Sequence, residues 1–315
     1  MNGIKICGTG SAIPAAAVSN ADLARIVRTD DEWIRSRTGI ERRHVAKKET
    51  HLSLCTEAAR SALAQANLDP SQIGVCIVAT FTPDTIVPSA ACLLQRELSL
   101  PQDCMCFDLN AACSGFLYAL HTAECLLAAS PYRHALIVGG ECLSRVLDWR
   151  DRSTCILFGD GAGAAVASFS PENTGLHAVV GCSGDDRILR VCGPGLREKP
   201  HVSMEGQAVF RFAVEAVPRC IGQVLERTGL TIGDIDQVVF HQANARIIDL
   251  AARKCRIPPH KVSKNIAEYG NTSAASVPIL LDELHRSGKL PSGFRALCVA
   301  FGGGLTWAGA LLEFE

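Results

Sequence analysis

Short apolar runs alternate along this chain with longer stretches in which apolar residues recur every three or four positions. The short runs predict β-strands at residues 73–80, 104–110, 134–140, 235–242 and 295–304. Helical periodicity separates them, at 88–98, from Cys113 through Leu126, at 210–229 and at 245–255. Strands that alternate with helices in this way predict an α/β fold, with a parallel sheet covered by helices.

The second half of the chain repeats the order of elements found in the first half. A turn-rich segment, SFSPENTG, lies at residues 168–175 between the two. At 315 residues the chain has about twice the length of a typical domain. We therefore expect an N-terminal half at 1–170 and a C-terminal half at 171–315, either as two domains or as one duplicated unit.

Composition indicates a folded protein with an extensive core. Hydrophobic residues make up 48% of the chain and charged residues 20%, and the formal net charge is −1. This balance gives no reason to expect a nucleic-acid partner or binding to an anionic membrane. No apolar run reaches about 18 residues, and the chain opens without a charged leader, so we expect a cytoplasmic protein.

The fifteen cysteines are predicted to be mostly reduced core residues. Their number is odd, and most of them lie inside apolar runs. Cys104 and Cys106 are spaced too closely for the usual metal-binding pair, and no matching pair of Cys or His follows, so we expect no metal site.

The glycines of FGDGAGAAV, at residues 158–166, offer two interpretations. A glycine-rich turn can bind the phosphates of a dinucleotide, but that motif requires the spacing G-x-G-x-x-G and a following helix. Here the spacing is G-x-G-x-G, and a run of small residues follows. Close packing of the backbone is the favoured interpretation.

Three residues are candidates for chemistry. Cys113 follows a predicted strand and begins a helix, where the helix N-terminus is expected to lower the pKa of a thiol below about 8.5. His241 follows the strand IDQVVF, at the strand end where α/β sheets bind ligands, and Asn271 lies in a Gly-Asn turn. Taken singly, each has an ordinary alternative: an inert buried cysteine, a packed or solvated histidine, and a turn residue.

Taken together with their surroundings, these residues resemble the β-ketoacyl synthase III family of thiolase-like condensing enzymes. The resemblance runs almost from end to end and rests on the segments GTGSAIP, TDDEWIRSRTGI, PSAAC, DLNAACSGF, FGDGAGAAV, HQANARI, YGNTSAASVP and FGGGLTW. It implies that Cys113, His241 and Asn271 are catalytic. It also implies a five-layered α-β-α-β-α fold with internal duplication, in a homodimer.

The implied reaction is a decarboxylative Claisen condensation that initiates fatty acid biosynthesis. An acyl-CoA starter would acylate Cys113, and malonyl-acyl carrier protein would supply the attacking carbanion. His241 and Asn271 would donate hydrogen bonds to the thioester oxygen during decarboxylation. This chemistry needs no cofactor, because acyl-CoA is a substrate.

The resemblance also assigns binding residues. Trp33 and Arg152 would enclose the adenine of coenzyme A, and the expected coenzyme A set is Thr29, Trp33, Arg37, Arg152 and Arg246. The expected basic patch for the acyl carrier protein is Arg211, Arg246, Arg253 and Lys254. The alternatives are a tryptophan that packs its own helix and charges that are simply solvated.

One position departs from the family pattern. A bulky residue usually bounds the acyl pocket at the position of Val87, reached across the dimer interface, so we expect a starter that is longer than acetyl or branched. The segment 181–200 also differs from the family. A secondary-metabolite condensing enzyme or an acyltransferase of the same family remains an alternative. A papain-like cysteine hydrolase, which also uses Cys, His and Asn at about this spacing, is a distant one.

Overall fold

The computed structural model describes residues 3–170, 176–193 and 201–315, and two sheets dominate them. The first sheet has the strand order β1-β7-β6-β4-β5, with β1 at Gly3–Ala12, β4 at Ile73–Ala79, β5 at Met105–Leu109, β6 at His134–Glu141 and β7 at Gly161–Ser170. The second has the order β11-β12-β13-β8, with β8 at Val179–Asp185, β11 at Gln237–Phe240, β12 at Arg295–Gly302 and β13 at Gly304–Glu313. Each half of the chain thus supplies one sheet.

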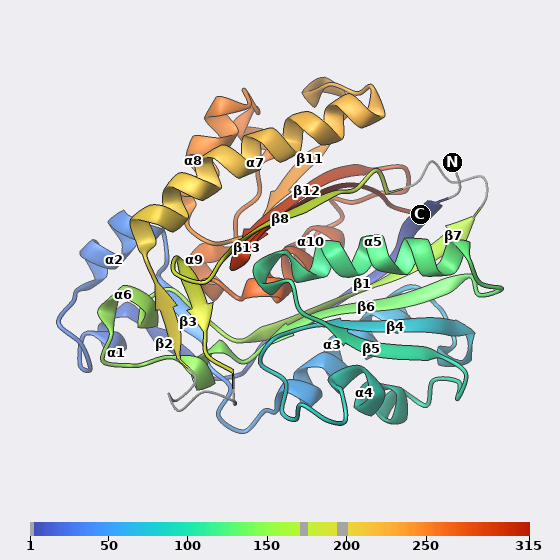
Figure 1. Cartoon of the computed structure of the whole chain (residues 1–315), viewed down its shortest axis with the longest axis horizontal. Coiled ribbons are helices and arrows are strands. Elements are labelled where there is room, and N and C mark those ends of the chain that lie inside the picture. Colours follow the sequence, from blue (N-terminus) through green and yellow to red (C-terminus); the bar gives the residue numbers. More distant parts are fainter. Residues whose placement is uncertain (1–2, 171–175, 194–200) are drawn as a thin grey trace.

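Helices form three layers around and between the sheets (Figure 1). The central layer consists of α5 at Gly115–Ala128 and α10 at Ser276–Arg286, which pack between the inner faces of both sheets. The outer face of the first sheet is covered by α3 at His51–Gln65 and α4 at Ala90–Leu98. The outer face of the second is covered by α7 at Gly206–Thr228 and α8 at Ala245–Lys254. The predicted five-layered α-β-α-β-α fold is therefore confirmed.

Strand β4 shows why a continuous apolar run predicts a strand in this fold. Successive side chains of a strand point to opposite faces of the sheet. Ile77 belongs to the core around α5 and α10, whereas Cys76 and Val78 belong to the core beneath α3 and α4. Because both faces of the sheet are covered, every residue of β4 is buried.

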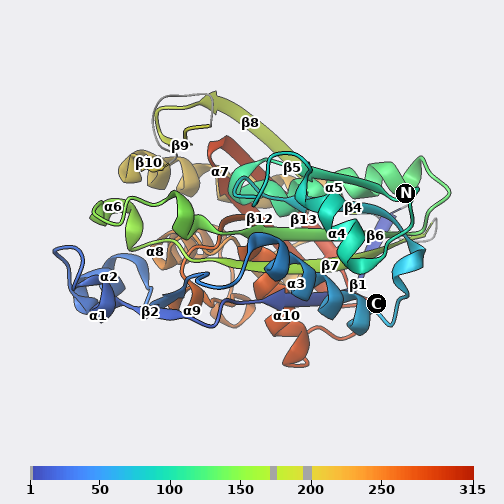
Figure 2. The ribbon, with the colours of Figure 1, turned by 90° about the horizontal axis from the view of Figure 1, so that it is seen from below.

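Smaller elements gather at the end of the molecule opposite the chain termini (Figures 1 and 2). They include α1 at Asn20–Leu23, α2 at Asp31–Thr38, α6 at Arg152–Cys155, α9 at Ile266–Tyr269, and the paired strands β2 at Ala17–Ser19 and β3 at Arg42–His44. Strands β9 at Leu189–Val191 and β10 at Val202–Met204 form a further pair. Short 3-10 turns complete the described elements: η1 Pro70–Gln72, η2 Ala112–Ser114, η3 Leu143–Val146, η4 Ile232–Asp234, η5 Pro259–Lys261 and η6 Ser273–Ala275.

The sheets are mixed, so the prediction of a parallel sheet is wrong in part. Strand β4 is parallel to β5 and β6, and β11 is parallel to β12, but β1, β7, β8 and β13 run antiparallel to their neighbours. The predicted strand 295–304 covers β12, the turn residue after it and the first residue of a second strand, since β13 begins two residues after β12 ends. Antiparallel neighbours need no crossover helix, and the alternation of strand and helix therefore gave no signal for them.

The boundary proposed between the halves falls largely on residues 171–175, which lie outside the described residues, and the division at 170/171 stays a prediction. The glycines of 159–163 lead into β7 and not into a helix. A Cβ atom on Gly163 would lie 2.6 Å from the backbone nitrogen of Ile279 in α10. This confirms the interpretation of those glycines as positions of close backbone packing.

In the described part of the chain, no helix combines the length and the apolar character that crossing a membrane requires.

Candidate active site

Cys113 lies in η2, between the end of β5 and the start of α5. Ala112 before it has a φ of +46°, which turns the chain sharply into the helix. The cysteine is only 8% exposed. A Cβ atom on Gly302, at the end of β12, would lie 2.7 Å from the backbone nitrogen of Cys113. Residue 302 must therefore be a glycine for the two halves of the chain to pack against each other at Cys113.

Burial controls the ionisation of this thiol. It raises the pKa of Cys113 to about 12, and the negative charge of Glu141 acts in the same direction. A hydrogen bond with Ser273 opposes the shift of this pKa. The prediction that the helix N-terminus would lower the pKa of Cys113 is thus contradicted, because the loss of hydration outweighs the favourable helix end.

His241 follows β11 and is held from three directions. Its backbone N–H donates to the carbonyl oxygen of Val299 at 2.8 Å, and its Nδ1 lies 2.6 Å from Oγ of Ser276. The ring of Phe301 packs against the imidazole edge to face, with 5.5 Å between centroids. Burial lowers the pKa of His241 to about 3, so the imidazole is neutral at physiological pH.

Ser276 is the hydrogen-bond partner of Nδ1 of His241. The backbone N–H of Gln242 also donates to Oγ of Ser276, at 3.4 Å, and the serine hydroxyl can then donate its own proton to Nδ1 of His241. A neutral imidazole that accepts at Nδ1 carries its proton on Nε2. In that arrangement His241 would donate a hydrogen bond through Nε2, the role that the resemblance implies for it.

Asn271 is fixed through both its backbone and its side chain. Its N–H donates to the carbonyl oxygen of Leu157 at 2.8 Å, and its carbonyl oxygen accepts from the N–H of Gly159 at 3.0 Å. Gly270, with a φ of +66°, allows the chain to turn closely past Leu157. The backbone N–H of Ser273 donates to Oδ1 of Asn271 at 2.9 Å. The amide nitrogen Nδ2 is the group left to donate to a substrate.

One continuous set of contacts joins the three candidates. Cys113 contacts Gly302 and Ser273, Ser273 hydrogen-bonds to Asn271, and Phe301 next to Gly302 packs on His241. Sequence reasoning assigned no role to Ser273, Ser276, Glu141 or Phe301. The signals for them were slight: the two serines lie in the quoted segment YGNTSAASVP, and Glu141 is an acid at the end of an apolar run.

The expected adenine site lies at the end of the molecule formed by α2 and α6 (Figure 1). The Arg152 guanidinium stacks directly on the Trp33 ring, 4.5 Å from its centroid. A base can lie between them only if the pair opens to about 7 Å, twice the usual stacking distance. Arg152 also lines an open depression of about 600 Å³ with Ile26, Val27, Arg28 and Arg150. The hydroxyl oxygen of Thr29 is buried and has no protein hydrogen-bond partner among the described residues.

Arg37 and Arg246 belong to adjoining helix ends. Nδ2 of Asn244 donates to the carbonyl oxygen of Arg37 at 3.1 Å, and Oδ1 of Asn244 accepts from the N–H of Arg246 at 2.9 Å. Asn244 therefore caps α8 and ties it to the C-terminus of α2. This places both arginines on the side of the molecule that carries Trp33.

The predicted basic patch lies on the neighbouring helices α7 and α8. Arg211, Arg246, Arg253 and Lys254 are all exposed. Nζ of Lys254 donates to the carbonyl oxygen of Val214 in α7 at 2.9 Å, so this lysine joins the two helices.

Val87 lies far out on the loop between β4 and α4, with 85% of its surface exposed, and Ile86 beside it is also exposed. Strand β5 forms the nearby edge of the first sheet, and its Met105 is exposed as well.

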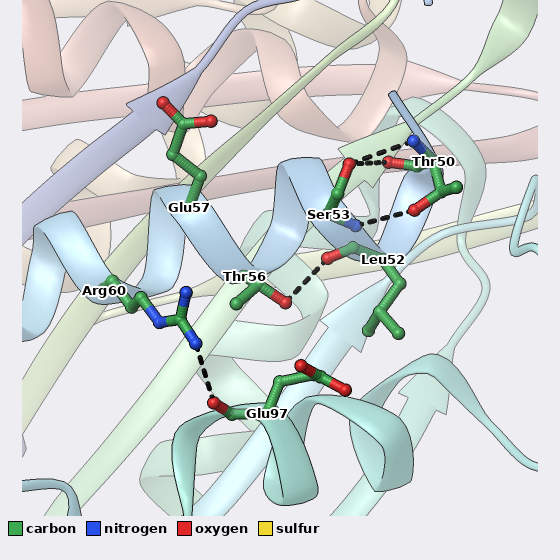
Figure 3. Close-up of a pocket in the computed structure, with 7 residues that line it drawn as sticks. All are labelled: Thr50, Leu52, Ser53, Thr56, Glu57, Arg60 and Glu97. Carbon is green, nitrogen blue, oxygen red and sulfur yellow. Dashed lines mark hydrogen bonds between the residues drawn. The ribbon is translucent and has the colours of Figure 1, made fainter. Parts of the chain in front are cut away.

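A second depression, of about 590 Å³, lies over α3 and the end of α4 (Figure 3). Its polar groups are largely engaged with one another: Thr50 and Ser53 cap α3, and Arg60 donates to the carbonyl oxygen of Glu97. None of the candidate catalytic residues lines it.

Comparison with known proteins places this geometry in context. Residues 107–184 match the family model of 3-oxoacyl-[acyl-carrier-protein] synthase III, and residues 225–314 match the model of its C-terminal part. A β-ketoacyl-[acyl-carrier-protein] synthase III of Clostridium acetobutylicum is 43% identical, over 100% of this chain and 99% of its own. The crystal structure of 3-oxoacyl-[acyl-carrier-protein] synthase III from Aquifex aeolicus VF5 matches with a TM-score of 0.94 at 43% identity, over 99% of this chain and 100% of that one. A priming β-ketosynthase from the R1128 polyketide pathway matches with a TM-score of 0.94 at 38% identity, over 99% and 96%.

Proposed function

The chain belongs to the 3-oxoacyl-[acyl-carrier-protein] synthase III family and is a decarboxylating acyltransferase, and we propose that Cys113, His241 and Asn271 carry out its two half-reactions. The observation that carries this assignment is the single contact network that joins a buried thiol to two oriented neutral donors.

In the first half-reaction, the sulfur of Cys113 attacks the carbonyl carbon of an acyl-CoA, and coenzyme A leaves. The tetrahedral intermediate carries a negative oxygen. The backbone N–H of Cys113 and one N–H of the glycine run 302–304 would donate to that oxygen, and the close packing of Gly302 against Cys113 supports this proposal.

In the second half-reaction, malonyl-acyl carrier protein loses carbon dioxide, and negative charge develops on its thioester oxygen. Nε2–H of His241 and Nδ2–H of Asn271 donate to this oxygen. Both donors are neutral and fixed before the substrate arrives, His241 by Ser276 and Asn271 by Ser273. The resulting carbanion attacks the acyl group on Cys113, and the carbon–carbon bond forms as the sulfur leaves.

The residues exposed on the surface support a route for substrate delivery. Coenzyme A would enter at Thr29, Trp33, Arg37, Arg152 and Arg246, after the stack of Trp33 and Arg152 opens. The exposed cations Arg211, Arg246, Arg253 and Lys254 would hold the acidic carrier protein, since opposite charges steer such an encounter.

A second copy of the chain would complete the acyl pocket. Strand β5 is an open sheet edge, and the exposed Ile86, Val87 and Met105 lie on or near it. A valine presented to the partner's pocket leaves more room than an aromatic residue would, which favours a starter longer than acetyl or branched. Sedimentation should give a dimer.

The test separates the two half-reactions. After exposure to a panel of acyl-CoA thioesters, intact-mass and peptide analysis should find one acyl group, on Cys113 among the fifteen cysteines. Cys113→Ala should abolish this transfer and still release carbon dioxide from a malonyl thioester. Asn271→Ala should still be acylated, while decarboxylation falls about 100-fold or more. If Asn271→Ala lost acylation and kept decarboxylation, the assigned roles would be wrong.

A further inference from the structure

The mechanism above leaves one buried acid unused. Glu141, the last residue of β6, is 1% exposed and lies beside the reactive centre. Its Oε1 accepts a hydrogen bond from Oγ of Ser273 at 3.3 Å. Ser273 is itself 1% exposed and adopts a φ of +51°, and its hydroxyl lowers the pKa of the Cys113 thiol. A serine hydroxyl thus stands between the thiol and the carboxyl group.

The other oxygen of Glu141 is held by the segment that follows β4. Oε2 accepts from Oγ1 of Thr80 at 3.1 Å, from the N–H of Phe81 at 3.3 Å and from the N–H of Thr82 at 3.2 Å. Oγ1 of Thr82 donates to the same oxygen. Four donors on one oxygen fix the carboxyl group and leave Oε1 directed to Ser273.

We propose that Ser273 and Glu141 form the proton relay for Cys113, with Ser273 as a catalytic residue in contact with the sulfur and Glu141 as the acceptor that acts through it. This inference rests on the proposed function, because it supplies the proton step of the acyl transfer to Cys113.

The relay balances in both half-reactions. As the sulfur bonds to the starter carbonyl, the thiol proton passes to Oγ of Ser273, and the serine proton passes to Oε1 of Glu141. The leaving coenzyme A thiolate then takes a proton back through the same groups. After condensation, Cys113 leaves as a thiolate. Glu141, which takes up a proton from solvent, returns that proton to the sulfur through Ser273, and this is the one proton that the decarboxylative condensation consumes.

The ionisation of the neighbouring groups favours this acceptor over the histidine. Burial raises the pKa of Glu141 to about 8, whereas it lowers the pKa of His241 to about 3. The thiol of Cys113, whose pKa is about 12, therefore transfers its proton far more readily to Glu141 than to His241. Proton uptake also removes the negative charge of Glu141, which otherwise opposes a thiolate at Cys113.

Among the described residues, few other titratable groups lie near Glu141. Cys55 of α3 and Cys142 after β6 are thiols whose pKa values are raised by burial, and each responds to the charge of Glu141. His51 of α3, whose pKa burial lowers, hydrogen-bonds to the carbonyl oxygen of Gly140. Beyond them, Arg145 and Asp84 pair with one another. Glu141 is therefore the group in this cluster expected to titrate near pH 8.

The relay predicts a pH profile that a purely structural role would not produce. Glu141 accepts a proton only when ionised, so self-acylation by the acyl-CoA that labels Cys113 fastest should rise with pH through about 8. Glu141→Gln keeps the size and the acceptor oxygen but cannot take the proton. It should lower self-acylation by about 100-fold or more and remove the step in the profile, while malonyl decarboxylation stays within about threefold. Ser273→Ala should do the same to acylation.

Two further variants guard against misfolding. Glu141→Asp keeps a titratable carboxyl and should recover part of the rate together with the step. Thr80→Val removes one hydrogen bond that lowers the pKa of Glu141, so the step should move to higher pH while the plateau rate remains. Alkylation of Cys113 by iodoacetamide, mapped by peptide mass, should follow the same profile without any substrate.

The proposal is overturned if Glu141→Gln acylates at the wild-type rate with an unchanged profile. It is overturned equally if Glu141→Gln loses both half-reactions together while Glu141→Asp restores rate without the pH step, since Glu141 would then only support the fold. A wild-type protein that never acylates Cys113 would instead refute the proposed function.

Discussion

Replacing Ser276 by Ala should slow decarboxylation, because the proton of the His241 ring is then no longer held on Nε2. The Ser276 hydroxyl lies 2.6 Å from Nδ1, and both side chains are buried, so no bulk water can replace the lost partner. The hydrogen bond from Ser276 to Nδ1 favours the tautomer that carries its proton on Nε2 by about 1 to 3 kcal/mol. Without the serine hydroxyl, the other tautomer loses this disadvantage, and that form presents Nε2 to the substrate oxygen as an acceptor.

A shift of about 1.4 to 2.8 kcal/mol toward the unproductive form lowers the rate about 10- to 100-fold. We therefore expect Ser276→Ala to release labelled carbon dioxide from a malonyl thioester that much more slowly, while acyl transfer to Cys113 changes by less than about threefold. Nitrogen NMR of the imidazole should show the proton moving from Nε2 to Nδ1. Ser287→Ala, which removes a hydroxyl at the far end of α10, is the matched control.

The explanation fails if decarboxylation in Ser276→Ala falls while Nε2 keeps its proton. It also fails if both half-reactions decline by the same factor, because that result would indicate general damage to the site.

Three other predictions follow from the same structure. Val87→Phe should shift the starter preference toward acetyl-CoA, because an aromatic residue displaces several methylenes of acyl chain; an unchanged chain-length profile would show that Val87 does not bound the pocket. Charge reversal at Arg246 and Arg253 should raise KM for the carrier-protein substrate and leave acylation by coenzyme A thioesters unchanged. Arg60→Glu, a charge reversal at an exposed position on α3, is the control. An equal fall in both half-reactions would indicate damage to the shared site. Because the pKa of His241 is lowered, the imidazole binds a proton below about pH 6.5 in the unfolded chain but only below about pH 3 in the folded chain. The free energy of unfolding should therefore fall as the pH drops, by about 2 kcal/mol between neutral pH and pH 5. Denaturant unfolding at the two pH values should show a smaller fall for His241→Asn, which lacks the titrating ring.

Sequence patterns located the buried elements well, since a strand covered on both faces leaves a continuous apolar run, as in β4. They gave strand directions poorly, because direction depends on connections that the pattern does not encode. The hairpin of β12 and β13 is the clearest case: its glycines resembled a strand end and not a turn between two strands.

The candidate site came from chain-wide resemblance, and the structure added what supports it. Ser273 and Ser276 orient Asn271 and His241, yet in the sequence they are two small residues in a run of small residues. The prediction of a lowered pKa at Cys113 was wrong. The sequence shows that the cysteine lies at the start of a helix, but it does not show how deeply the sulfur is buried, because that burial arises where four distant segments meet.

The central layer of α5 and α10 also bears on how such an enzyme can diversify. Both helices begin at the reactive centre and are covered on two sides by sheets, so almost any change there disturbs the packing of both halves. The loops, short helices and exposed helix faces that would meet coenzyme A, the carrier protein and the acyl chain lie at the periphery, where substitutions disturb little packing. Selection can therefore retune substrate choice at the rim while the chemistry stays fixed in the interior. Engineering toward new starters is best directed at positions such as Val87, and mutational libraries that include α5 or α10 should yield mostly unfolded protein.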